Sequence, residues 1–194
     1  NSANDIVSSR FQMMELSMPL PILIKNVRCV SSRGIITQDV LLESGKISRL
    51  GKIADKFGGH IMEAGHLFLL PGVLDPQVHF RDPGMLWKED LRTGSMAAAA
   101  GGVTSFFDMP NTKPSTISIE AMSERKRVAS EKCVVNYNFF IGATNTNLDV
   151  LNQVDNVPGI KIFMGSSTGD LLVSAVKDLD EIFGNGSRLI AVHA

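Results

Sequence analysis

After Pro71 the chain alternates between short apolar runs and longer helical segments, and this alternation limits the fold more than any other feature of the sequence. The first apolar run reads as a buried strand that closes within residues 75–81. Further strands are expected at 103–108, 134–141, 160–164 and 189–193, and helices at 89–100, 118–132, 147–153 and 171–183. A repeated strand–helix order indicates a parallel sheet with right-handed crossovers.

Polar side chains gather where the expected strands end. Residues 75–81 close the first strand, 108–111 close the second and His193 closes the fifth, while Lys161 lies inside the fourth. In a β/α barrel the carboxyl ends of the strands form the rim on which the active site is built. An open Rossmann-like sheet would instead need a glycine-rich phosphate loop, which this sequence lacks. The pattern therefore favours a barrel with a site at its rim.

The first of these strands carries four polar residues at alternate positions. They are Asp75, Gln77, His79 and Arg81. Because strand side chains alternate between two faces, all four are expected on one face. Asp82, which precedes a Pro-Gly pair, is expected to be a turn or cap residue. For Asp108 a structural role and a functional role are equally supported.

The first part of the chain has a different pattern, in which short strands are broken by polar turns. Strands are expected at 22–26, 38–42, 46–50 and 66–70, with a hairpin turn at 43–46. This pattern predicts a small β-sandwich-like domain over residues 19–70, followed by the barrel portion over 71–194. Residues 1–18 are expected to be a tail, either disordered or a tag. Because the chain begins with Asn1, we expect a processed, tagged or longer product.

Composition excludes several classes of function. The 194 residues include 19 basic and 20 acidic side chains, and a net charge of -1 gives no electrostatic basis for binding nucleic acid or a membrane surface. The two cysteines are far apart and indicate neither a disulfide framework nor a zinc knuckle. No apolar run has the length of a membrane span, and no signal-peptide pattern is present, so a cytoplasmic location is expected.

Four motifs in the second part of the chain are long, ordered and correctly spaced relative to one another. They occupy residues 71–84, 88–90, 97–104 and 109–112. Together they resemble the motifs of the cyclic amidohydrolases, most closely those of the dihydroorotases, and their length makes the resemblance specific. It implies an α/β fold, a (β/α)8 TIM barrel of the amidohydrolase type, with about the first five strands present and a small N-terminal β domain.

The resemblance also implies roles for individual residues. His79 and His193 match zinc ligands of the family, and Lys161 matches the lysine that CO2 converts to a carbamate bridging two zinc ions. Arg81 and Asn111 match the residues that hold the substrate carboxylate. These roles suit the side chains, since imidazole is a good zinc ligand and a guanidinium binds a carboxylate through two hydrogen bonds. A lysine ammonium would repel the metal, whereas its carbamate supplies two anionic oxygens.

One position departs from the family pattern. Gln77 stands where the family has the first histidine of a His-x-His pair. An amide oxygen is a weaker zinc ligand than imidazole, so the resemblance leaves occupancy by one or two zinc ions open. The family's remaining histidine and its general-base aspartate, on the eighth strand, have no counterpart within residues 1–194. We therefore assign no catalytic base here, and the chain alone is expected to be inactive.

The implied activity is that of a zinc-dependent dihydroorotase, which interconverts N-carbamoyl-L-aspartate and dihydroorotate in pyrimidine biosynthesis. A homodimer is the expected assembly. Two alternatives stay open. One is another cyclic amidohydrolase, an allantoinase or hydantoinase. The other, motivated by Gln77, is an inactive homologue that associates with aspartate carbamoyltransferase.

Overall fold

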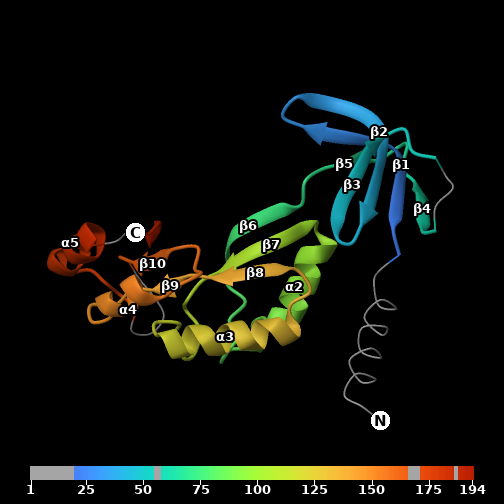
Figure 1. Ribbon diagram of the computed structural model, residues 1–194. Helices are drawn as coiled ribbons and strands as arrows, with labels where there is room; N and C mark the ends of the chain where they lie inside the picture. The colour runs from blue at the N-terminus through green and yellow to red at the C-terminus, as the bar shows by residue number, and fades with distance from the viewer. Residues whose placement is uncertain (1–19, 55–57, 166–170, 186–187) are drawn as a thin grey trace, which may run out of the picture. The chain divides into compact units, whose positions relative to one another are not determined.

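The computed structural model describes residues 20–54, 58–165, 171–185 and 188–194. The chain divides between Pro71 and Gly72 into two compact units (Figure 1). The tail predicted at residues 1–18 lies outside the described residues. Within the described residues, no helix combines the length and the apolar character needed to cross a membrane.

The first unit is a five-stranded sheet. Its strands are β1 (Ile22–Ser31), β2 (Gly34–Glu43), β3 (Lys46–Gly51), β4 (His60–Glu63) and β5 (Phe68–Leu69). Their order is β3-β2-β1-β4, and β5 also pairs with β1. The first three strands are antiparallel neighbours, whereas β4 and β5 run parallel to β1. The sequence predicted the first three strands, with shorter bounds, but it did not predict β4.

The turn between β2 and β3 follows the sequence prediction. Ser44 and Gly45 have φ angles of 50° and 73°, so both central residues are left-handed. Two left-handed residues form the tight hairpin turn whose twist matches that of the flanking strands. Behind the hairpin, the small core of this unit centres on Val27, Val40 and Ala64.

The second unit consists of parallel strands and the helices that connect them. Its strands are β6 (Val73–Val78), β7 (Val103–Asp108), β8 (Asn136–Phe139), β9 (Ile141–Gly142), β10 (Ile160–Phe163) and β11 (Ile190–His193). Its helices are α2 (Leu91–Ala100), α3 (Ile119–Lys132), α4 (Leu148–Gln153) and α5 (Val176–Asn185). The strands form two sheets of three, β6-β7-β8 and β11-β10-β9, and every pair is parallel, as predicted.

The two sheets meet at Phe140. The predicted strand 134–141 is split there into β8, which pairs with β7, and β9, which pairs with β10. The Phe140 N–H donates to Asp108 O (3.0 Å) and the Ile141 N–H donates to Gly159 O (3.3 Å), so hydrogen bonding passes from one sheet to the other. The carboxyl ends of all these strands therefore belong to one rim.

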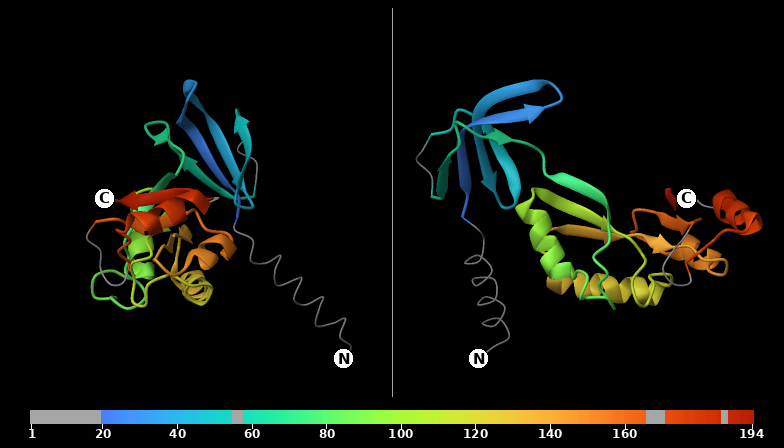
Figure 2. Two further views of the ribbon diagram at one scale, coloured as in Figure 1. Left: turned by 90° about the vertical axis from the view of Figure 1, so that its left-hand side faces the viewer. Right: turned by 180° about the vertical axis from the view of Figure 1, so that it is seen from behind.

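Helices α2 and α3 cover one face of the β6-β7-β8 sheet (Figures 1 and 2). Side chains from the helices and strands form one core that includes Leu91, Phe106, Met122 and Phe139. Helix α2 begins after Asp90, whose carboxylate accepts hydrogen bonds from the N–H groups of Arg92 and Thr93. A capping acidic residue of this kind explains why the predicted start of the helix was correct to within two residues.

Two predictions about this unit are wrong. The apolar start of β6 was expected to be buried, but Val73 and Leu74 are 54% and 47% exposed, because β6 has β7 as its single partner strand among the described residues. The last helix was expected to begin at residue 171, but α5 begins at Val176. Leu172 instead forms a parallel bridge with Phe163, so the segment before α5 extends β-sheet pairing.

Candidate metal and substrate site

Strand β6 does not keep the regular alternation that the sequence predicted. Its register with β7 shifts between Asp75 and Val78, where β6 contains one residue more than its partner. The Gln77 N–H donates to Asp75 Oδ1 (3.0 Å) within this bulge, and Arg81 has a left-handed φ of 66°. A bulge reverses the alternation on one side of it, so the predicted single face for Asp75, Gln77, His79 and Arg81 is wrong.

Hydrogen bonds nevertheless connect three of the candidate residues, two of which lie in the segment after β6. His79 Nδ1–H donates to Asn111 Oδ1 (2.8 Å), and Arg81 Nη1 donates to the Asn111 backbone oxygen (2.9 Å). Asn111 is 6% exposed and follows β7, the strand next to β6. Because Asn111 Oδ1 can only accept, the neutral His79 ring carries its proton on Nδ1 and keeps the lone pair of Nε2 free.

The other two candidates lie on β10 and β11, which are paired neighbours. Lys161 is 2% exposed, and its ammonium donates to Val192 O (3.2 Å). Burial lowers the pKa of Lys161, because an ammonium is less stable away from water. His193 ends β11 and is exposed, with its ring 6.0 Å from the ring of Phe163. In the part of the chain that the structure describes, no hydrogen bond or ring contact joins this pair to His79 or Asn111.

The donor set suits a metal ion. His79 has a free imidazole nitrogen oriented by Asn111, the arrangement usually found for histidine ligands of zinc. Lys161 is a buried amine with one carbonyl partner, and carbamylation would convert this amine into an anionic oxygen ligand.

The remaining candidate ligand, Gln77, is exposed. No group of three His, Cys, Asp or Glu side chains suited to a metal occurs among the described residues. The ligand assignments therefore stay predictions.

A buried ion pair lies directly behind these residues, and the sequence did not identify it. Arg125 Nη2 donates to Asp108 Oδ2 (2.5 Å), and both side chains are almost completely buried. Burial raises the pKa of the Asp108 carboxyl, while Arg125 and two backbone N–H groups oppose the rise. The Asp108 carboxylate therefore pairs with a side chain of helix α3. Asp108 and Arg125 are 17 residues apart, so no local pattern could have linked them.

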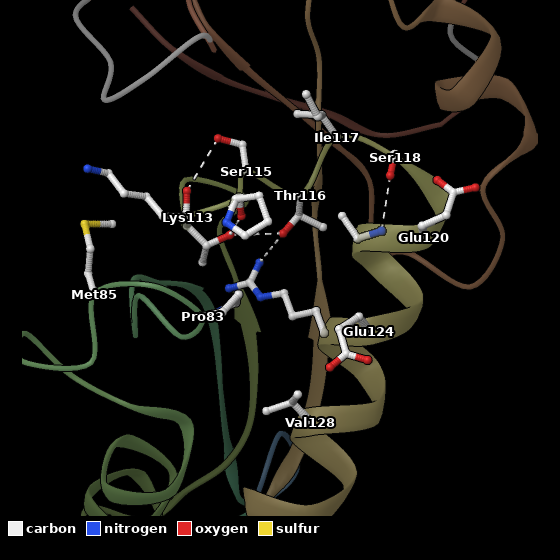
Figure 3. A pocket seen from close by; sticks show the side chains of 14 residues that line it. Pro83, Met85, Lys113, Ser115, Thr116, Ile117, Ser118, Glu120, Glu124 and Val128 are labelled. Atoms are coloured by element: carbon white, nitrogen blue, oxygen red, sulfur yellow. Dashed lines mark hydrogen bonds between the residues drawn. The ribbon is translucent and has the colours of Figure 1, made fainter.

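A pocket of about 950 Å³ lies on the helix side of this ion pair (Figure 3). Its walls are the loop with Pro83 and Met85, the segment from Thr112 to Ser118, and one side of α3. None of the candidate metal or substrate residues lines it. We therefore place the candidate site at the strand ends and not in this pocket.

A model of the amidohydrolase family matches residues 68–178, which is more than half of the chain. The chain belongs to the amidohydrolase family. This membership confirms the resemblance that was inferred from the motifs at 71–84 and 109–112, both of which lie within the matched region. The matched region also contains five of the six candidate residues, namely Gln77, His79, Arg81, Asn111 and Lys161.

Curated relatives of this amidohydrolase chain include dihydroorotases and allantoinases. Dihydroorotase from Methanosarcina acetivorans is 35% identical over 156 residues, covering 78% of this chain and 33% of that protein. Allantoinase from Bacillus velezensis is 30% identical over 185 residues, covering 91% of this chain and 40% of that protein. The chain thus spans between a third and two fifths of the length of these relatives.

The solved structure of L-hydantoinase (dihydropyrimidinase) from Arthrobacter aurescens matches with a TM-score of 0.80 at 29% identity. The match covers 90% of this chain and 41% of that structure. It confirms the predicted fold class, an amidohydrolase α/β barrel fold of which β6 to β11 form a part, with a small N-terminal β region.

Asp82 anchors the amidohydrolase loop that follows β6. Its Oδ2 accepts hydrogen bonds from the Leu91 N–H (3.2 Å) and from the Lys132 ammonium (2.7 Å). Leu91 is the first residue of α2, whose N-cap is Asp90, so Asp82 accepts one further N–H group of the first turn from outside the helix. The carboxylate connects the β6 loop to both α2 and α3.

Gly84 allows two loops of the site to meet, and its replacement is expected to destabilise them. Gly84 has a φ of 96°, and a β-carbon there would overlap the Lys113 carbonyl oxygen. For Gly84→Ala we expect the free energy of unfolding to fall by about 2–4 kcal/mol, from strain and overlap together. Chemical denaturation of the full-length protein measures this value.

Gly102→Ala is the matched control. Gly102 has a similar φ of 83°, but a β-carbon there would meet nothing within 4 Å. It should lose only the backbone contribution, about 1–2 kcal/mol. Equal losses in the two variants would contradict the close contact between the Gly84 and Lys113 loops.

Proposed function

We propose that this chain forms part of the active-site rim of a zinc-dependent dihydroorotase of pyrimidine biosynthesis. Such an enzyme adds water to the ring amide of dihydroorotate. The ring C–N bond breaks, the nitrogen gains a proton, and N-carbamoyl-L-aspartate forms; ring closure is the reverse reaction. The dihydroorotases at 33–38% identity support this substrate, and the allantoinases at 30–34% identity are the competing group.

The observation that carries the proposal is the contact between Arg81 and Asn111 beside His79. Arg81 Nη1 donates to the Asn111 backbone oxygen. This hydrogen bond fixes the guanidinium and leaves its other N–H groups available to a ligand. Asn111 accepts with Oδ1, so its amide NH2 keeps two donors. Donors from both residues suit the carboxylate of dihydroorotate and would orient the ring for reaction.

His79, His193 and carbamylated Lys161 would hold zinc beside this carboxylate site. When bound, zinc makes a coordinated water acidic near neutral pH and polarises the amide carbonyl. Asn111 contributes to both metal binding and substrate binding, because its side chain orients the His79 ring and its backbone oxygen orients Arg81. A shift of Asn111 would therefore disturb metal binding and substrate binding together.

Turnover of dihydroorotate, allantoin and hydantoin by the full-length protein tests the proposed substrate. We expect kcat/KM for dihydroorotate to exceed that for hydantoin by about a hundredfold or more, because hydantoin leaves the carboxylate donors unpaired. A preference for allantoin or hydantoin would identify a different cyclic amidohydrolase. Absence of turnover on all three would favour an inactive homologue.

A further inference from the structure

We propose that the buried Asp108–Arg125 pair is a positioning device that holds Arg81 and Asn111 at the spacing required to bind the substrate carboxylate. This role rests on the proposed function. Among the described residues, no hydrogen bond joins the pair to a candidate ligand side chain or to the side chain of Arg81 or Asn111. The pair acts instead through hydrogen bonds to the two segments that carry Arg81 and Asn111.

The first segment is held at Phe80, the residue between His79 and Arg81. The Phe80 N–H donates to Asp108 Oδ1 (3.3 Å). The Phe80 ring packs edge-on against Phe106, with 4.8 Å between the ring centroids, and lies against Gly94 of α2, where a β-carbon would come within 2.8 Å of the ring. Because the backbone and the ring of Phe80 are both held, the backbone of the two residues that flank it is held as well.

The second segment is held on both sides of Asn111. On one side, the Met109 N–H donates to Asp108 Oδ1 (2.8 Å) and Arg125 Nη1 donates to Met109 O (2.9 Å). On the other side, Arg125 Nη1 donates to Thr116 Oγ1 (3.2 Å), a contact that Figure 3 shows at the pocket wall. Asp108 and Arg125 thus fix the beginning and the end of the segment that contains Asn111.

Stability alone does not account for this ion pair. Two buried charges lose hydration, and apolar residues of similar volume often stabilise a protein equally well or better. An apolar pair cannot accept the Phe80 and Met109 N–H groups, nor donate to Met109 O and Thr116. What Asp108 and Arg125 contribute beyond an apolar pair is therefore a set of directed hydrogen bonds. These hydrogen bonds hold the two segments that carry Arg81 and Asn111.

Two uncharged double variants of the full-length, metal-loaded protein distinguish the effect of the hydrogen bonds from the effect of the charges. D108N/R125Q keeps an acceptor for both N–H groups, but its glutamine is shorter than arginine and donates to fewer of the Met109 and Thr116 oxygens. D108L/R125M has neither. We expect the KM for dihydroorotate to rise by less than about tenfold in D108N/R125Q and by about tenfold to a hundredfold in D108L/R125M. The kcat should change less than the KM in both.

The same changes in an Arg81→Ala background distinguish positioning from a general structural role. If Asp108 and Arg125 act through Arg81, D108L/R125M should raise the KM little further once Arg81 is gone. An increase of the same factor in both backgrounds would overturn the proposal. Should D108L/R125M fail to fold, Arg125→Lys replaces it. This variant keeps a cation beside Asp108 but cannot reach all the oxygens that Arg125 contacts, so an unchanged KM would also overturn the proposal.

Amide hydrogen exchange tests the positioning role without any turnover. We expect the Phe80 and Met109 amides to be protected in wild type and in D108N/R125Q, and to exchange at least tenfold faster in D108L/R125M, with the amides of α2 unchanged. Equal protection in all variants would overturn the positioning role. Failure of wild type to turn over dihydroorotate would instead overturn the proposed function alone.

Discussion

Lys161→Met is expected to remove nearly all cyclic-amide hydrolysis while leaving the fold intact. Methionine has a similar length and suits the apolar surroundings of residue 161, since Ile160, Ile162 and Phe163 are all buried. It removes a buried ammonium, so the melting temperature should hold or rise. Methionine cannot form a carbamate. We expect kcat to fall at least roughly a thousandfold, or about 4 kcal/mol of transition-state stabilisation.

Zinc analysis should be made on the same sample. If the Lys161 carbamate is a ligand, the variant should retain less zinc per chain than wild type after gel filtration. Lys177→Met, at an exposed position on α5, is the matched control and should change neither turnover nor zinc content. Wild-type turnover by a folded Lys161→Met protein would remove residue 161 from the site.

Arg81→Ala is expected to raise the KM for dihydroorotate by about a hundredfold or more, because a charge-assisted pair with the substrate carboxylate is lost. Alanine should add no backbone strain, since Arg81 already has a left-handed φ of 66° that both residues tolerate equally. Steady-state kinetics over a wide range of dihydroorotate concentrations gives KM and kcat separately. The effect should fall mainly on KM, since Arg81 holds a part of the substrate that does not react.

Arg81→Lys and Arg127→Ala complete this test. Lysine keeps the charge but lacks the planar fork, so it should recover only part of the affinity. Arg127 is an exposed arginine on α3 that pairs with Glu124 and Glu131, and its loss should leave KM unchanged. An Arg81→Ala enzyme with unchanged kinetics would exclude the carboxylate role.

Local features of the sequence predicted the elements best. The carboxylate of Asp90 and the hydroxyl of Ser118 mark the first turns of α2 and α3, and both accept backbone hydrogen bonds as capping residues. Strand β7 has the predicted bounds, Val103–Asp108. Each of these signals lies within a few residues of the element that it predicts, and so it can be recognised without knowledge of the fold.

Features that depend on pairing between distant segments were missed. The bulge between Asp75 and Val78 depends on the register of β6 against β7, and nothing in the spacing of the polar residues indicates it. For the same reason the role of Asp108 stayed open, because its partner Arg125 lies on the following helix. Family motifs pointed to His79, Arg81 and Asn111, which hydrogen bonds connect in the structure, whereas the contacts that hold these residues required the fold.

The most direct test of the proposed site is an anomalous difference map of the full-length protein, measured at the zinc absorption edge. We expect zinc about 2.0–2.1 Å from a ring nitrogen of both His79 and His193, with carbamate density on Lys161. We also expect the His79–Asn111 hydrogen bond to be retained. A map without zinc at these residues, in which the unmodified Lys161 ammonium still donates to Val192 O, would contradict the proposed site.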